Sequence, residues 1–238
     1  MKGRVKRNFS TCAENYDRLA KFQAEAGKRA LQLLKRFGFE KPVVDLGAGT
    51  GRLLNGSGVF CLDLSPKMAK LCKERGCASV CGDAERLPFK DGSFSSAFSN
   101  FSLQWTDLQL SLKECSRTLK EGGLFVLSVP VEGSLKTLFK CWREVSDFPL
   151  FRFPTAEEVL KAFKLYFKPF YGERFTLKER FRGAKEALKQ VNGIGAKNPH
   201  GRPKRKDVLK FLELYQKEPV VEYEVLIVCG RKRGEDSP

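Results

Sequence analysis

Residues 43–51 read Val-Val-Asp-Leu-Gly-Ala-Gly-Thr-Gly, and this nonapeptide constrains the fold more than any other stretch. Its β-branched residues predict a buried parallel strand. Its three alternating glycines predict a tight turn around a ligand, because glycine adopts positive φ and lets the backbone approach closely. The spacing is Gly-x-Gly-x-Gly, whereas dinucleotide sites carry Gly-x-Gly-x-x-Gly, with the third glycine placed for helix–strand packing. We therefore expect a nucleotide-like ligand that is not a dinucleotide.

Polar residues end three further short apolar runs downstream. The run at residues 59–63 ends in Asp63, Asp83 follows the next run, and Asn100 closes a third. In doubly wound sheets an acid at the end of the second strand accepts hydrogen bonds from ribose hydroxyls. Ser65 and Pro66 also predict a helix N-cap and first turn, so a charge at a helix N-terminus is the alternative role of Asp63.

These stretches, in this order, resemble the motifs of class I methyltransferases that bind S-adenosylmethionine. The resemblance implies that Asp63 binds the ribose, that Asp83 binds the adenine amino group and that Asn100 lies beside the methionine moiety. The cofactor residues that it implies are Asp45, Gly47, Ala48, Gly49, Gly51, Asp63, Leu64, Met68, Asp83, Ala84, Asn100 and Phe101.

Strands and helices alternate through the first half of the chain. A capping box at Thr11 and Glu14 predicts one amphipathic helix to about Phe37, closed by Gly38. Strands are expected at about 42–47, 59–64, 78–82, 95–100 and 123–130, and helices at 66–75 and 106–119. Such alternation with short connections predicts a parallel sheet with right-handed crossovers.

The pattern changes after Pro130. Helices are expected at 134–145, 155–167, 184–191 and 205–216, a strand at 173–181 and a last, antiparallel strand at 220–229. The expected fold class is α/β: a Rossmann-like, seven-stranded, mostly parallel class I methyltransferase sheet with an N-terminal helix and a helical lid insertion. We expect a single methyltransferase domain over residues 1–238, divided into an N-terminal helical cap (1–40), a cofactor-binding core (41–130), a lid and substrate region (131–219) and the last strand with the tail (220–238).

Composition narrows the class of protein further. The chain has 238 residues, eight cysteines, one histidine and a formal net charge of +16. No apolar run approaches the roughly 20 residues of a membrane span, and no signal sequence is evident, so we expect a cytoplasmic protein that does not act at membranes. The cysteines lie in or beside apolar runs without the spacing of a zinc site, and no metal is expected.

Further motifs resemble the malonyl-[acyl-carrier protein] O-methyltransferases of biotin synthesis. The resemblance is carried by residues 9–23 around Tyr16, by Gln104-Trp105, and by Gly193-Ile194 followed by Gly-Ala; shorter matches lie at 131–135, 152–153 and 221–225. Two features depart from the family. Only eleven residues separate Gly51 from Asp63, so the first crossover helix should be about a turn shorter, and the basic loop at 197–206 is not part of the family pattern.

The resemblance implies that the free carboxylate of a malonyl thioester attacks the methyl group of S-adenosylmethionine. A carboxylate is already ionised at pH 7, so the reaction needs no general base, in keeping with a single histidine. Tyr16 and Arg152 are the candidate catalytic residues, because a phenol and a guanidinium can each hold the carboxylate. The candidate substrate-binding residues are Tyr16, Gln104, Trp105, Arg152, Gly193 and Ile194.

The implied partner is an acidic acyl-carrier protein bearing malonyl-phosphopantetheine. Positive charge is densest at residues 197–210, and a field of this sign attracts acidic partners. The candidate contacts are Lys197, Arg202, Lys204, Arg205 and Lys206.

Three other functions remain open from the sequence. An RNA methyltransferase would account for the charge of +16, although residues 99–102, Ser-Asn-Phe-Ser, offer neither a catalytic cysteine nor a proline-rich base pocket. A small-molecule methyltransferase of quinone type would share the cofactor motifs. A non-catalytic adaptor with the same fold is the third, and the intact acidic residues and glycines of the cofactor motifs argue against it.

Overall fold

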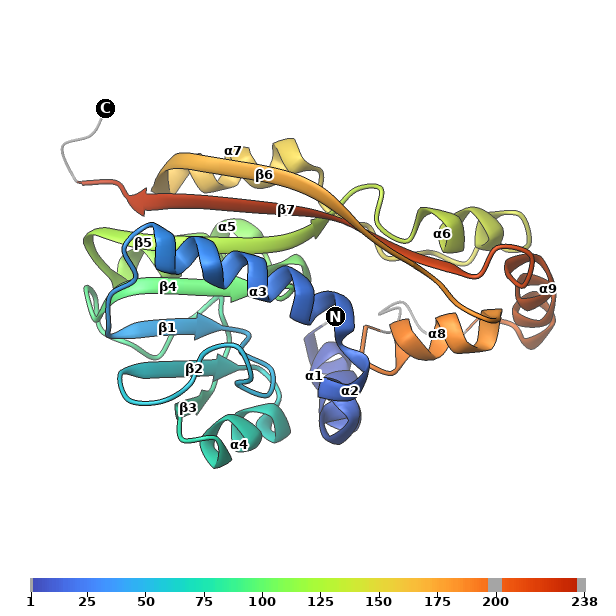
Figure 1. Cartoon of the computed structure of the whole chain (residues 1–238), viewed down its shortest axis with the longest axis horizontal. Helices are drawn as coiled ribbons and strands as arrows, with labels where there is room; N and C mark the ends of the chain where they lie inside the picture. Colours follow the sequence, from blue (N-terminus) through green and yellow to red (C-terminus); the bar gives the residue numbers. More distant parts are fainter. Residues whose placement is uncertain (1, 197–202, 235–238) are drawn as a thin grey trace.

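The computed structural model describes residues 2–196 and 203–234, and its centre is a seven-stranded sheet (Figure 1). The strand order is β3-β2-β1-β4-β5-β7-β6. β7 pairs antiparallel with both β5 and β6, and every other neighbouring pair is parallel, which confirms the predicted fold class. The strands are β1 Val43–Leu46, β2 Val59–Asp63, β3 Ala78–Cys81, β4 Phe94–Asn100, β5 Leu119–Val131, β6 Phe167–Arg180 and β7 Val220–Lys232.

Two strands begin earlier than the sequence pattern predicts. β5 begins at Leu119, the last residue of the expected helix, and contains Gly122 with a φ of 66°. β6 begins at Phe167, whereas the alternating pattern becomes clear only at residue 173. Pro169 and Gly172 hide the strand pattern in the first half of β6, where pairing with β7 determines the conformation. Tertiary pairing has overridden local propensity here.

Helices cover both faces of the sheet (Figure 1). α3 (Lys21–Arg36) packs on β4, β5 and β7, while α5 (Leu108–Thr118) and α7 (Ala156–Tyr166) pack together on the opposite face. Side chains alternate between two hydrophobic cores, as the two-residue period of a strand requires. In β1, for example, Val43 joins the core beneath α3, and Val44 joins the other.

The prediction of one helix from Thr11 to Phe37 is wrong. The segment forms α1 (Lys2–Cys12), a 3₁₀ turn (Ala13–Asn15), α2 (Tyr16–Leu19) and α3. Thr11 lies inside α1 and its hydroxyl donates to the Asn8 carbonyl, so it caps no helix. The chain bends at Ala20, where ψ is 51°, and this bend turns α1 and α2 towards the carboxyl ends of the strands (Figure 1).

The expected short first crossover helix is also absent, since residues 47–58 contain no helix. Five glycines in this segment, at 47, 49, 51, 56 and 58, have positive φ, a conformation that no run of helix tolerates. The loop instead packs by its buried Leu54 side chain and accepts thiol hydrogen bonds from Cys61 and Cys77 at the Leu54 carbonyl. Cysteines here act as small hydrophobic residues with a weak donor.

The region after β5 supplies three helices around the projecting ends of β6 and β7: α6 (Lys136–Arg143), α8 (Ala184–Asn192) and α9 (Arg205–Tyr215) (Figure 1). Packing between α6 and α9 includes Trp142 and Phe211, with ring centroids 5.2 Å apart. The capping box of α7 is confirmed, because the Thr155 and Glu158 side chains each accept from the backbone of the other. Within the part of the chain that the structure describes, no helix has both the length and the apolar character needed to cross a membrane.

Asp17 ties the N-terminal helices to the glycine-rich loop. Its carboxylate accepts a hydrogen bond from the Thr50 hydroxyl at 2.6 Å and forms an ion pair with Arg75 at 2.6 Å. Arg52 donates to the Asp17 carbonyl at 2.8 Å. Burial would raise the pKa of Asp17, but Thr50 and Arg75 outweigh it and hold the pKa below its usual range.

This contact predicts the effect of Asp17→Asn. The variant loses the charge that Arg75 and Thr50 bind, and such bonds contribute about 1–2 kcal/mol. Amide hydrogen exchange in α1 and α2 should therefore quicken by roughly 5- to 30-fold, with a smaller change in global stability. Asp91→Asn is the control, since Asp91 also pairs with an arginine at 2.6 Å, but on an exposed turn. Equal rates of amide exchange in α2 in both variants would contradict the role of Asp17 in holding the N-terminal helices to the glycine-rich loop.

Candidate active site

Three neighbouring pockets open where α1 and α2 cover the carboxyl ends of the strands, and Tyr16 lines all three. The strand-end pocket lies along Gly49, Asp63 and Asp83. The loop pocket lies between α3 and β1, along Gln23, Asp45 and Asn100. The aromatic pocket extends towards α6 and α8. Tyr16 is thus the residue at which the three meet.

Asp63 organises the strand-end pocket. One carboxylate oxygen accepts from the Gly49 N–H at 3.0 Å and the other from the Ser65 N–H at 2.8 Å. Burial raises the pKa of Asp63 to about 6, although the Ser65 and Gly49 donors favour the ionised form. Ser65 itself caps α4 (Pro66–Glu74) by accepting from the Met68 N–H. The capping role therefore belongs to Ser65, and Asp63 fixes the glycine-rich loop.

The far wall of the strand-end pocket carries Asp83 with Leu64, Met68 and Ala84. Lys2, from the first turn of α1, forms ion pairs with Asp83 at 2.6 Å and Glu85 at 2.5 Å. Sequence reasoning missed Lys2, because nothing in a basic N-terminal segment indicates which lysine reaches across to a carboxylate 81 residues away.

The loop pocket is lined by acceptor oxygens. Asp45 is 2% exposed, and burial, followed by the charge of Asp63, raises its pKa to about 8. The Asn100 side-chain amide donates to the Gln23 carbonyl at 2.8 Å. Among the described residues, neither Asn100 Oδ1 nor Gln23 Oε1 has a hydrogen-bond partner. A carboxyl group and two unpartnered amide oxygens suit a ligand that carries N–H donors or positive charge.

Close backbone approach explains the glycines of the loop. A Cβ at Gly47 would lie 1.8 Å from Ser102 Oγ, and one at Gly51 would lie 3.2 Å from Cys72 Sγ. At Gly49, whose φ is 58°, it would contact the Tyr16 ring at 3.6 Å. Phe101 adopts a φ of 52° and lines both the strand-end and the aromatic pockets. Such strain in a non-glycine residue is typical of functional sites.

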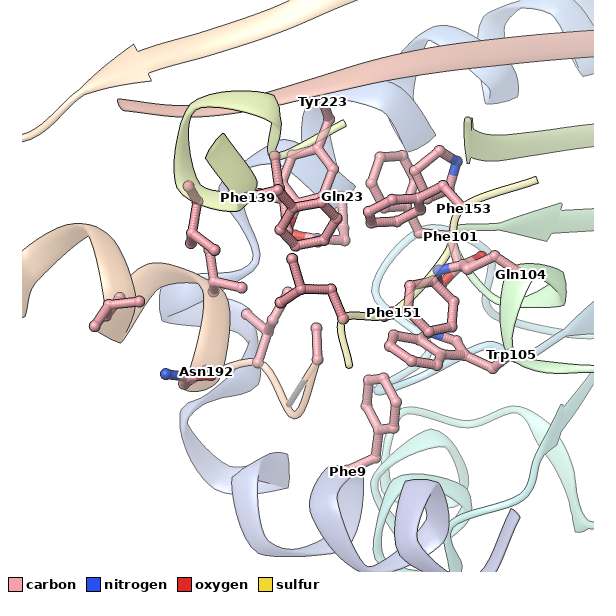
Figure 2. Close-up of a pocket in the computed structure, with 18 of the residues that line it drawn as sticks. Phe9, Gln23, Phe101, Gln104, Trp105, Phe139, Phe151, Phe153, Asn192 and Tyr223 are labelled. Atoms are coloured by element: carbon pink, nitrogen blue, oxygen red, sulfur yellow. Dashed lines mark hydrogen bonds between the residues drawn. The ribbon is translucent and has the colours of Figure 1, made fainter. Parts of the chain in front are cut away.

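Rings form most of the aromatic pocket (Figure 2). Trp105 packs against Phe151 with centroids 4.4 Å apart and against Phe9 at 6.1 Å. Phe139 and Tyr223 lie across the hollow from them (Figure 2). The walls of the cavity are therefore mostly apolar. Sequence reasoning missed Phe9 and Tyr223, whose spacing in the chain does not distinguish a pocket wall from a core.

Polar side chains also line this cavity, among them Gln104 and Tyr16. Gln104 donates from Nε2 to the Phe101 carbonyl at 2.9 Å, and its Oε1 has no partner within the described residues. Burial and then the charge of Asp63 raise the pKa of Tyr16 well above its usual value. The Tyr16 phenol therefore remains protonated and is a hydrogen-bond donor at neutral pH.

The Gly-Ile-Gly-Ala segment closes the pocket against the N-terminal helices. Ile194 is 3% exposed and lines the aromatic pocket. Gly193 does not line it, but a Cβ there would lie 2.4 Å from Leu19 Cδ1. Gln190 donates to the Leu19 carbonyl. Gly193 thus lets the end of α8 approach α2 closely, which places Ile194 over the cavity.

The structure does not bring Arg152 to the other predicted residues. Its side chain is 70% exposed and pairs with Glu158 at 2.6 Å. Arg152 lines an open groove beside α6 rather than any pocket that Tyr16 lines. Lys204, Arg205 and Lys206 lie at the N-terminus of α9, whereas Lys197 and Arg202 fall outside the described residues. No cluster of potential metal ligands occurs within residues 2–196 and 203–234.

Comparison with known proteins agrees with this geometry. The family described as "Methyltransferase domain" matches residues 44–127. A SAM-dependent methyltransferase from Thermotoga maritima shares the fold with a TM-score of 0.59, at 22% identity over 96% of this chain and 100% of that one. Geranyl diphosphate C-methyltransferase from Streptomyces coelicolor, in complex with S-adenosyl-L-homocysteine, does so with a TM-score of 0.57, at 18% identity over 87% and 77%.

Relatives of known sequence are more similar. The malonyl-[acyl-carrier protein] O-methyltransferase of Erwinia pyrifoliae is 33% identical over 88% of this chain and 84% of its own length. That of Yersinia pestis is 34% identical over 81% and 74%. Since the likeness extends over most of the chain, far beyond the matched methyltransferase domain, the protein belongs to the malonyl-[acyl-carrier protein] O-methyltransferase family.

Proposed function

We propose that the protein transfers a methyl group from S-adenosylmethionine to the free carboxylate of malonyl-acyl-carrier protein, the esterification that its family supplies to biotin synthesis. The observation that carries this proposal is the position of Tyr16. Its protonated phenol lies where an aromatic pocket meets the two pockets that suit the cofactor. One donor can therefore hold an acceptor carboxylate beside the transferable methyl group.

The strand-end and loop pockets fit S-adenosylmethionine, which supplies a methyl group on a sulfonium. The unpartnered oxygens of Asn100 and Gln23, beside Asp45, would accept from the ammonium of its methionine moiety. Asp63 would accept from the ribose hydroxyls, since each carboxylate oxygen keeps a second lone pair after bonding Gly49 or Ser65. Asp83 would accept from the adenine amino group beside its ion pair with Lys2.

The malonyl carboxylate needs no general base, because it is ionised at neutral pH. The chain's contribution is to hold this anion and to remove water from it. Tyr16 donates a hydrogen bond to one carboxylate oxygen and leaves the other free to react. The rings of Phe9, Trp105 and Phe151 exclude solvent around it. Anion and sulfonium lose their charges as they react, so an apolar pocket favours the transition state.

Of the two other predicted contributions, Arg152 and the basic residues, we keep only the second as a proposal. Arg152 would need to leave Glu158 and turn inward to reach a carboxylate at Tyr16, so we assign the carboxylate to Tyr16 alone. The basic residues Lys204, Arg205 and Lys206, with Lys197 and Arg202 outside the described part, are proposed to contact the carrier protein. The positive charge of these residues would attract an acidic surface on the carrier protein.

A methyl-transfer assay tests the proposal. Labelled S-adenosylmethionine is offered with malonyl-carrier protein, malonyl-coenzyme A and bulk RNA in parallel reactions. We expect label on the malonyl thioesters and none on RNA. Label on RNA alone would favour an RNA methyltransferase, the function that the net charge of +16 also suits.

Tyr16→Phe removes the proposed donor and keeps the ring. A hydrogen bond to a charged group contributes about 1.5–3 kcal/mol, so kcat/KM for the malonyl substrate should fall roughly 10- to 100-fold. The dissociation constant of the cofactor should change little. Tyr171→Phe is the control, because the Tyr171 hydroxyl donates to Glu173 on β6, outside the three pockets. A fall in cofactor affinity without a fall in kcat would contradict the role of Tyr16.

Cofactor affinity should rise with pH. The pKa values of Asp63 and Asp45 in the free protein are raised to about 6 and about 8. A ligand with ammonium and sulfonium groups binds their ionised forms better, so binding releases protons. Affinity should therefore increase by up to about tenfold per pH unit between roughly pH 6 and 8, where Asp45 titrates, rise more steeply below pH 6, where both groups titrate, and level off above about pH 8.

Isothermal titration of S-adenosylmethionine in buffers of different ionisation enthalpy measures this proton release. Asp45→Asn should remove most of the dependence above about pH 6, because only Asp63 then titrates in the site. An affinity that stays constant from pH 5 to 8 in the wild-type protein would show that these carboxyl groups do not bind the cofactor.

A further inference from the structure

The outer face of α6 carries a stripe of three cations. Lys136, Lys140 and Arg143 follow one another at intervals of four and three residues, which places them on one side of a helix. All three are exposed, and none forms an ion pair with any described residue. Leu138 and Trp142 bury the opposite side of the helix. These three cations are therefore available to bind an acidic partner.

A second set of cations adjoins this stripe. Ser146, three residues after α6 ends, donates to the Asp207 carboxylate in the first turn of α9 at 2.9 Å. This bond brings the N-terminus of α9, with Lys204, Arg205 and Lys206, to the end of the α6 stripe. The two sets form what we call the α6–α9 basic face: Lys136, Lys140, Arg143, Lys204, Arg205 and Lys206.

An open groove adjoins this face. Its walls are α6 and the segment 144–153, and it is lined by Lys136, Lys140 and Arg143. Phe139, Leu150, Phe151 and Phe153 line both the groove and the aromatic pocket that contains Tyr16. The groove and the aromatic pocket are therefore neighbours that meet at these apolar side chains.

The groove itself is close to neutral. Glu132, Glu144 and Asp147 line it together with the α6 cations and Arg152, which pairs with Glu158. The groove thus carries charges of both signs, whereas the residues that it shares with the aromatic pocket are apolar. This division matches a partner with an acidic surface and a thin, uncharged arm, rather than a polyanion that would occupy the groove itself.

We propose that the α6–α9 basic face docks the acidic surface of the acyl-carrier protein and that the groove admits its pantetheine arm. The inference rests on the proposed function and adds the surface and the direction of approach. The arm carries amide N–H groups, and Gln104, which lines the aromatic pocket with an unpartnered Oε1, would accept from one of them. The malonyl carboxylate at its end then reaches the Tyr16 phenol.

The test compares charge reversal on two surfaces. One variant is Lys136→Glu, Lys140→Glu and Arg143→Glu. The matched control is Lys161→Glu, Lys164→Glu and Lys168→Glu, three exposed lysines near the end of α7 and the start of β6. These elements lie at the opposite end of the molecule from α6 (Figure 1), and the net charge changes equally. Circular dichroism confirms that each variant is folded.

Each variant is assayed with malonyl-carrier protein and with malonyl-pantetheine, which lacks the protein. We expect the α6 variant to raise KM for malonyl-carrier protein about tenfold or more and to reduce its salt dependence. Its kcat/KM for malonyl-pantetheine should stay within about twofold of wild type. For the control variant, KM for malonyl-carrier protein and kcat/KM for malonyl-pantetheine should both stay within about twofold of wild type. Alanine at the three α6 positions should give a smaller loss in the same direction.

Three outcomes overturn the docking surface: an unchanged KM for malonyl-carrier protein, equal losses in the α6 variant and the control, or a loss with malonyl-pantetheine as large as that with the carrier protein. If wild-type protein methylates neither malonyl thioester, the proposed function itself fails and the docking proposal with it. Activity on malonyl-pantetheine separates these two failures.

Discussion

The hydrogen bond from the Gly49 N–H to the Asp63 carboxylate is the contact on which the rest of the site depends. It joins the turn after β1 to the end of β2, and no helix fills the crossover between these strands. The loop conformation must therefore come from contacts with neighbouring elements. Asp63 provides one, and the Cys72 thiol, which donates to the Gly49 carbonyl at 3.1 Å, provides another. Glycine at 47, 49 and 51 lets the backbone pass through this narrow space.

The N-terminal helices α1 and α2 form further walls of the pockets beside the glycine-rich loop. Asp17 binds Thr50 and Arg75, and the adjacent Tyr16 thereby contacts the loop at Gly49. Because the same helices also pack against the end of α8 through Leu19, one group of contacts shapes the cofactor pockets and closes the aromatic pocket. The pockets that we propose for the cofactor and the acceptor consequently meet at Tyr16. The docking surface that we propose on α6 adjoins a groove that shares apolar residues with the aromatic pocket.

Much of the sheet could be predicted, because strand patterns and turn residues are local signals. The order of the motifs placed Asp63, Asp83 and Asn100 at neighbouring strand ends, where the structure has them. Long-range contacts could not be predicted in this way. Thr11 looked like a cap because spacing alone cannot show that a helix already runs through it. Lys2 and Gln23 reach the pockets through tertiary packing. Arg152 lies outside the three pockets that Tyr16 lines and forms an ion pair with Glu158, which is only six residues away in the sequence.

The central claim is that the acceptor is a carboxylate held at Tyr16, and identifying the methylated atom tests it most directly. Malonyl-carrier protein is incubated with the enzyme and isotope-labelled S-adenosylmethionine, and mass spectrometry of the released acyl group locates the label. We expect label on the distal carboxyl oxygen, as an ester that mild base converts to labelled methanol. Label on the malonyl carbon, on the carrier polypeptide or only on RNA would contradict it.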